Sequence, residues 1–325
     1  MSYIESAKTY TGNDLETIFF RPMLSGPSAA DLGIRILYNM PVPTTIQLWS
    51  GRNNVLKQFT SAGWTGGEAA VKQQKSIAMH RVKAEMGFSA ADYFSLVYEL
   101  ITNRPDINMG DLTGTELEQA ETDLFKQSIA ESIRATMWAG DSAASEGYNT
   151  FDGFMRSIVD AVDDGETDLM SYTADDLKKP DTALAILEGL WESAPEILRD
   201  LKAEGQLAYF ATSDICHLYE KHLDSKGVDT AYVDTVNGRP TLSYHGIPII
   251  DTHASSYMKQ MSLPESFCIL TDRRNLVLAV NTSDFPGTEV RMWYNPDQME
   301  NRQRAVFMAG CDVLDHTLLA VAYKS

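Results

Sequence analysis

The amino-acid sequence predicts an α+β fold, with helices early and central in the chain and strands late. Three observations support this class: a capped amphipathic helix over residues 115–139, a period-2 strand over about residues 76–88, and a series of short apolar runs in roughly the last sixty residues. The chain has 325 residues, of which 44% are hydrophobic, so a sizeable core in one large domain or two to three small ones is available.

The first forty or so residues show no sustained periodicity. Turn formers recur in them, at Gly12-Asn13-Asp14 and Ser25-Gly26-Pro27-Ser28, and Pro41-Val42-Pro43 follows. We expect this segment to have little core of its own, so that other subunits or the rest of the fold must order it.

A projecting two-stranded structure is expected next. Short extended pieces lie around residues 45–49 and 54–59, and the glycine-rich stretch 63–68 permits sharp bends. From Ala78 onwards apolar and polar residues alternate, which predicts the strand over about 76–88.

Two helices follow. Ser89-Ala90-Ala91-Asp92 resembles a capping box before an apolar stripe that ends at Asn103-Arg104-Pro105. The second helix starts at the full capping box Thr115-Glu116-Leu117-Glu118 and stops at Gly140, so it is roughly 37 Å long.

The middle of the chain predicts mixed α/β structure. We expect helices from Asp181 and from Pro195 to Gly205, a buried strand over 207–211, and a helix from Ser213. Asn237-Gly238 signals a hairpin turn before extended runs at 241–244 and 247–250. The expected late strands are 267–270, 276–280, 290–294, 305–313 and 318–323.

Composition excludes several classes of protein. The net charge of −18 repels phosphate backbones, and no run of Lys and Arg in the sequence offsets it; the acidic excess is concentrated between Asp160 and Glu204. No apolar run is long enough for a membrane span, and the N-terminus lacks the pattern of a secretory signal. The three cysteines, Cys216, Cys268 and Cys311, are odd in number and far apart, which favours a reducing cytoplasm over a disulfide scaffold.

The search for a catalytic motif leaves one alternative open. Gly140-Asp141-Ser142 occurs in one class of serine esterases, with His316 as the candidate base, but the serine follows a helix and Asp312 to His316 has the wrong spacing. No phosphate loop, dinucleotide-binding glycine motif or carboxylate pair with the context of a general acid and base is present. We therefore expect no enzymatic activity and no cofactor.

A metal site was the other candidate. Cys216, His217 and His222 share an expected helix, but their spacing does not place them on one face; His245 and Asp251-Thr252-His253 follow on strands. A buried cysteine beside surface histidines is the favoured interpretation, so no metal ligands are predicted.

The order of these features resembles the major capsid proteins of tailed bacteriophages, which have the Hong Kong-97-type fold. The resemblance rests on the Gly63–Glu68 stretch as part of an extended loop, the strand 76–88 with the helix from Ser89 as its return, and the long helix ending in Trp138-Ala139-Gly140-Asp141 as a spine helix. It continues through Asn149–Phe154, the strand and helix from Tyr209 to Tyr219, Thr241-Leu242 and Gly246-Ile247-Pro248-Ile249.

The resemblance implies a division of the chain. It comprises an N-terminal arm (1–45), an extended β-hairpin loop (46–80), a peripheral domain (81–155) with its spine helix 115–139, an axial domain (156–262), peripheral-domain strands (263–313) and a closing axial strand (314–325).

It also implies a structural function in the virion capsid, assembled in the bacterial host cytoplasm. The expected partners are other copies in hexamers and pentamers, portal and scaffold proteins, and double-stranded DNA enclosed without sequence-specific binding. No scaffolding region of about a hundred residues precedes the arm, so a separate scaffold or none is implied, and no isopeptide cross-link is predicted. An encapsulin-like compartment shell and a serine hydrolase using Ser142 and His316 remain the alternatives.

Overall fold

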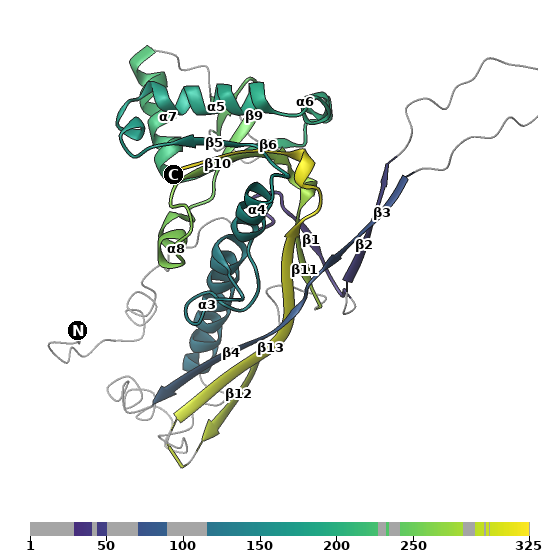
Figure 1. Ribbon diagram of the computed structural model, residues 1–325. Helices are drawn as coiled ribbons and strands as arrows, with labels where there is room; N and C mark the ends of the chain where they lie inside the picture. The colour runs from purple at the N-terminus through teal and green to yellow at the C-terminus, as the bar shows by residue number, and fades with distance from the viewer. Residues whose placement is uncertain are drawn as a thin grey trace, which may run out of the picture.

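The computed structural model confirms the α+β class: two sheets, one helical layer between them and a separate hairpin (Figure 1). It describes residues 29–40, 44–50, 71–89, 116–226, 232–233, 241–281, 290–295, 297–298 and 300–324. The arm residues 1–28, the expected strand 54–59, the helix expected after Ser89 and the Asn237-Gly238 turn lie outside these ranges.

The long helix α3 (Glu116–Ala139) confirms the predicted spine. Phe125, Ile129, Ile133 and Met137 lie on one face and are buried, as the helical spacing predicts. The helix ends at Ala139, and the next residue, Gly140, has no room for a side chain, because a Cβ there would clash with the carbonyl oxygens of Phe151 and Thr136.

A second helix, α4 (Phe154–Asp163), packs against α3. This helix is not among those that the sequence analysis predicts, although its apolar positions have helical spacing. Its buried residues are Phe154, Met155, Ile158 and Ala161.

The five-stranded sheet is built around β13 (Glu300–Val313). One side of β13 pairs with β4 (His80–Ser89); its other side pairs first with β12 (Val290–Asn295) and then with β11 (Leu276–Val280), beyond which lies β1 (Arg35–Leu37). Ala305 and Phe307 on β13 turn inward to the core, so the alternate residues face outward.

The seven-stranded sheet has the order β5-β14-β10-β6-β9-β8-β7. Its strands are β5 (Leu169–Tyr172), β14 (Leu319–Lys324), β10 (Phe267–Asp272), β6 (Leu207–Ala211), β9 (Ile247–Asp251), β8 (Thr241–Tyr244) and β7 (Tyr232–Val233). The strand predicted at 267–270 therefore exists, but its assignment to the same unit as 276–313 is wrong, because β10 lies between β6 and β14.

Helices cover both faces of this sheet. α5 (Asp181–Ser193) and α7 (Ser213–Lys226) lie on one face, and α4 and α8 (Ser255–Gln260) lie toward the other (Figure 1). The helix predicted from Pro195 to Gly205 is α6 (Glu196–Asp200) continued by the 3-10 turn η3 (Leu201–Glu204). Further 3-10 turns are η2 (Asp176–Lys178), η5 (Arg273–Asn275) and η6 (His316–Leu318).

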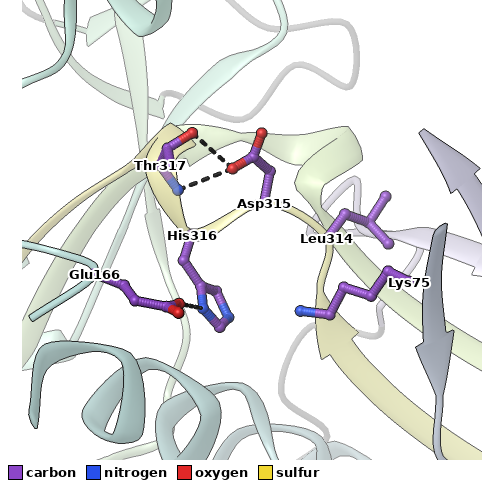
Figure 2. Close-up of a pocket in the computed structure, with 6 residues that line it drawn as sticks. All are labelled: Lys75, Glu166, Leu314, Asp315, His316 and Thr317. Carbon is purple, nitrogen blue, oxygen red and sulfur yellow. Dashed lines mark hydrogen bonds and ion pairs between the residues drawn. The ribbon is translucent and has the colours of Figure 1, made fainter. Parts of the chain in front are cut away.

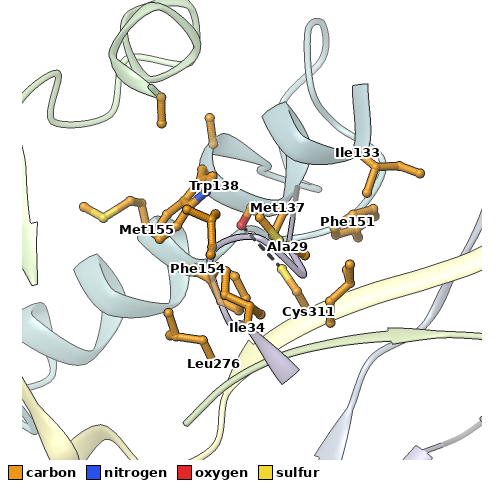
Figure 3. Close-up of a cluster of buried hydrophobic side chains, with 14 of the residues drawn as sticks. Ala29, Ile34, Ile133, Met137, Trp138, Phe151, Phe154, Met155, Leu276 and Cys311 are labelled. Carbon is orange, nitrogen blue, oxygen red and sulfur yellow. Dashed lines mark hydrogen bonds between the residues drawn. The ribbon is translucent and has the colours of Figure 1, made fainter. Parts of the chain in front are cut away.

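The main core joins the two sheets through the end of α3 (Figure 3). Trp138 is fully buried and its ring lies 5.5 Å from Phe154, 5.9 Å from Phe210 and 5.7 Å from Phe267. Because β6 and β10 supply the last two rings, this aromatic cluster fixes the seven-stranded sheet to the helical layer.

Residues 29–37 also belong to this core. Ala29, Leu32 and Ile34 are buried in it, and β1 pairs parallel with β11. The rest of the fold thus orders this part of the first forty residues, which is one of the two possibilities expected from the sequence. The buried positions are three and then two residues apart, so they follow neither a helical nor a strand period throughout.

The strand predicted at 76–88 is interrupted. β3 (Val71–Ile77) ends before Ala78, and β4 starts at His80. β3 pairs antiparallel with β2 (Thr44–Ser50) in a two-stranded hairpin that projects from the body (Figure 1). This arrangement fits the predicted projecting structure.

Candidate functional site

A polar cluster lies where the hairpin, β13 and the seven-stranded sheet meet. It borders a pocket of about 370 Å³ that is lined by Lys75, Glu166, Leu314, Asp315, His316 and Thr317 (Figure 2). The turn that presents His316 is held by Asp315, whose carboxylate accepts hydrogen bonds from the backbone N–H and hydroxyl of Thr317 at 2.9 and 2.6 Å.

His316 connects two neighbouring segments. Its Nδ1 lies 2.9 Å from Glu166 Oε2, and its Nε2 lies 3.2 Å from Ser157 Oγ. Ser157 Oγ in turn lies 3.1 Å from Asp312 Oδ1, and Lys75 of the hairpin lies 3.3 Å from the same carboxylate oxygen and donates to the Val313 carbonyl. The cluster therefore links β3, α4, β13 and η6.

The serine–histidine–carboxylate connectivity resembles that of a hydrolase, but the serine is Ser157. The exposed Ser142 lies in the loop after α3, and its backbone N–H donates to Asp152 Oδ1 at 2.7 Å. His316 contacts Ser157 and Glu166, so the structure does not bring the predicted pair Ser142 and His316 into hydrogen-bond contact.

Ser157 connects the Asp312 carboxylate with the His316 ring. A hydroxyl has one proton, and the Asp312 carboxylate competes with His316 Nε2 for it. Ser157 also lies within α4 and is not among the residues that line the pocket.

The residues considered as metal ligands are separated. Cys216 is buried, and burial raises the pKa of its thiol. His222 pairs with Asp181 at 2.8 Å, His253 with Asp251 at 3.3 Å, and His217 with Glu220 at 3.6 Å. His222 is itself buried, unlike the surface histidine expected. Within the described ranges no group of three or more His, Cys, Asp or Glu side chains is placed to hold a metal ion.

A basic surface emerges that sequence analysis missed. The outward face of β4, β13 and β12 gathers five basic side chains, which we call the basic sheet face: Arg81, Lys83, Arg291, Arg302 and Arg304. Period-2 alternation places Arg81 with Lys83 and Arg302 with Arg304 on one face of their strands, but only the strand pairing brings these two pairs together with Arg291.

The acidic residues on this face are fewer. Lys83 lies 2.7 Å and Arg304 3.5 Å from Glu85, and Arg302 lies 3.3 Å from Glu300. The hydrogen bond from Lys83 holds the pKa of the Glu85 carboxyl below its ordinary value. Arg291 lies directly opposite Arg304 in the ladder, an arrangement of like charges that disfavours strand pairing.

The hairpin is a further candidate for an interaction site. It pairs with no other strand in the part of the chain that is described, and a two-stranded ribbon alone is marginally stable in water. None of the described helices is long and apolar enough to cross a membrane.

Comparison with known sequences finds no matching family model and no matching curated protein. Solved structures do match. The satellite phage P4 procapsid including size determination (Sid) protein is similar with a TM-score of 0.57 and 9% identity, over 90% of this chain and 93% of that chain. The capsid of an empty GTA particle gives a TM-score of 0.55 and 11% identity, over 94% of this chain and 92% of that chain.

An encapsulin matches as well. The holo-SrpI encapsulin complex from Synechococcus elongatus PCC 7942 gives a TM-score of 0.50 and 11% identity, over 93% of this chain and 89% of that chain. These likenesses extend along nearly the whole chain, and they confirm the predicted fold: the chain has the Hong Kong-97-type fold of phage capsid proteins.

Proposed function

We propose that this chain is the major capsid protein of a tailed bacteriophage, which self-assembles into hexamers and pentamers of an icosahedral shell around double-stranded DNA. The observation that carries the proposal is the whole-chain likeness to capsid and procapsid structures. In this proposal the chain acts as a structural subunit in the virion, after assembly in the bacterial host cytoplasm with portal and scaffold proteins.

The architecture supports a role that requires neighbours. The β2–β3 hairpin projects from the body with no third strand among the described residues, and other subunits would supply the missing contacts (Figure 1). We assign α3 and the five-stranded sheet to the peripheral domain and the seven-stranded sheet with α5 and α7 to the axial domain.

The second candidate is an encapsulin-like compartment shell, which the SrpI likeness favours. Both candidates build shells from many copies, so they differ in what is enclosed. Terminase and portal genes beside the coding sequence would support the capsid, and a cargo enzyme gene in their place would support the compartment.

Negative-stain electron microscopy of the purified chain tests the common claim. We expect capsomer rings or closed shells of uniform size when salt and candidate scaffold proteins are varied. Only small monomers under all these conditions would contradict the proposal. The serine hydrolase alternative, with Ser142 and His316, predicts ester turnover that Ser142→Ala or His316→Ala abolishes, and we expect no such turnover.

A further inference from the structure

We propose that the basic sheet face is a docking surface for a second copy of this chain, and that it binds an acidic helix corner formed by Glu188, Glu192, Glu196 and Ile197. This inference rests on the proposed function, because a shell brings many identical copies of the chain together. It names the two surfaces of one contact between subunits.

The basic sheet face is unusual for this molecule. The whole chain has a net charge of −18, yet among the described residues five basic side chains and only two acidic ones, Glu85 and Glu300, lie together on this face. Three of the basic side chains remain substantially exposed: Lys83 at 54%, Arg304 at 48% and Arg302 at 37%. Arg291 lies opposite Arg304 in the ladder, so two basic side chains adjoin each other at the place where an acidic partner would bind.

Apolar side chains interrupt this positive charge. Trp293 lies opposite Arg302 and is 41% exposed, and Val306 lies opposite Lys83 and is 39% exposed. Tryptophan and arginine are enriched at the buried centres of protein interfaces. A protein surface with acidic and apolar side chains would both neutralise the basic charge and cover Trp293 and Val306, whereas the net charge of −18 disfavours a nucleic acid.

The acidic helix corner has the complementary composition. Glu188 and Glu192 are one helical turn apart on α5, and Glu196 begins α6 after a short bend. All three side chains are exposed, and in the described structure none forms an ion pair. Burial raises the pKa of Tyr244 nearby, and the charges of Glu188 and Glu192 raise it further.

An exposed apolar residue lies at this corner too. Ile197 is 66% exposed, the largest value among the large hydrophobic residues described as exposed. Each surface thus offers an excess of one charge around exposed apolar area. One lies on the five-stranded sheet and the other on α5 and α6, which cover the seven-stranded sheet (Figure 1). Their contact would be head-to-tail, which closes into rings when the rotation between copies permits.

A complementation experiment tests this geometry. The first variant combines Arg291→Glu with Arg304→Glu, and the second combines Glu188→Lys with Glu192→Lys. In sedimentation velocity we expect the wild type to self-associate and each variant alone to associate at least about tenfold more weakly. An equimolar mixture of the variants should recover association, because each then presents one intact surface to the other.

Controls separate docking from folding. Circular dichroism and thermal melts should be preserved in both variants, and Arg291→Gln with Arg304→Gln provides a version without new repulsion against Glu85. The inference is overturned if the wild type does not self-associate, if either variant associates as the wild type does, or if the mixture gains nothing. Loss of DNA retention in a gel-shift assay with unchanged self-association would equally overturn it in favour of nucleic acid.

Electron microscopy of the same samples distinguishes the two proposals. If the arginine variant forms shells as well as the wild type does, the proposed docking surface is ruled out and the capsid function is unaffected. Complementation in solution without rings or shells in any sample would support the docking surface and count against the capsid function.

Discussion

Two glycines set how closely the helices of the main core approach. A Cβ on Gly153 would lie 2.7 Å from the Gly140 nitrogen and 2.9 Å from the Trp138 carbonyl carbon, and Gly153 N–H donates to the Gly140 carbonyl at 2.9 Å. The start of α4 thus rests on the backbone at the end of α3. Because Trp138 lies in this contact, a shift there would disturb the aromatic cluster between the two sheets.

We expect Gly153→Ala to lower the free energy of unfolding by about 1–3 kcal/mol, the usual cost of inserting a methyl group where there is no room. Gly87→Ala is the matched control, because the nearest atom to its added Cβ is a Glu300 side-chain oxygen at 3.8 Å. Urea denaturation of both variants measures the difference. Equal midpoints would show that the helix ends can separate without cost.

The three cysteines give a pH-dependent prediction at the same scale. Burial raises the pKa of the thiols of Cys216, Cys268 and Cys311 above the ordinary value. In the unfolded chain they ionise at about pH 8.5, whereas the folded protein keeps them neutral. Their stabilising contribution is therefore fully present below about pH 8.5 and is lost as pH rises through the folded values.

We expect the urea midpoint in reducing buffer to fall as the pH is raised above about 8.5. Cys268→Ala should reduce the slope of that fall, because one ionising group is removed. Thiol-reactive dyes should label the native protein only as fast as it unfolds. Immediate labelling at neutral pH would contradict the burial of these thiols.

At the scale of elements, the hairpin is attached to the body at two places. Gly310 on β13 lies directly against the Ala78 carbonyl, at the break between β3 and β4. Lys75 on β3 contacts Asp312 and the Val313 carbonyl. These contacts hold the base of the hairpin against β13 and give it a defined direction.

Lys75→Ala should loosen the hairpin without unfolding the protein, because a partly exposed ion pair contributes about 0–1 kcal/mol. Hydrogen exchange of the β2 and β3 amides should speed up, and the melting temperature should change little. Lys83→Ala removes another ion pair on a neighbouring strand and should leave hairpin exchange unchanged. Exchange that responds equally to both substitutions would show that Lys75 has no special role.

The helices and strands also differ in how well the sequence predicts them. α3 and the late strands were predictable because capping residues and periodicity are local signals. The sheet to which β10 belongs was not predictable. All six residues of this strand are buried, so its apolar run does not indicate which sheet it joins. The basic sheet face was missed for a related reason, since residues near 81, 291 and 303 become neighbours only through pairing.

The polar cluster around His316 could be predicted only in part. The sequence indicates His316 as a candidate base, and its short Gly140-Asp141-Ser142 motif indicates Ser142 as the partner. The structure brings His316 instead to Ser157, which lies in a helix that was not predicted, and to Glu166 beyond that helix. Long-range hydrogen bonds leave no periodic trace in the sequence.

At the scale of the whole molecule, two electrostatic effects oppose each other. Copies with a net charge of −18 repel over long range, whereas the basic sheet face and the acidic helix corner attract at contact. Salt screens distant charges first, since the Debye length falls from about 30 Å at 0.01 M to about 3 Å at 1 M.

Self-association should therefore be strongest at intermediate salt, on the order of 0.1 M, and weaker at both extremes. Light scattering across a sodium chloride series measures this. The control with Glu188→Gln and Glu192→Gln has less long-range repulsion and a weaker contact, so its maximum should be lower. A steady rise with salt would indicate that apolar contacts alone drive association.

The position of β13 and β14 also affects how the protein is made. β13 is the central strand of one sheet, and β14 lies between β5 and β10 in the other. Both are formed by residues after 299, so neither sheet can close until the ribosome has translated that part of the message. Nascent chains would then hold incomplete sheets while many copies are translated side by side, and chaperones that cover exposed strand edges would be needed during that interval.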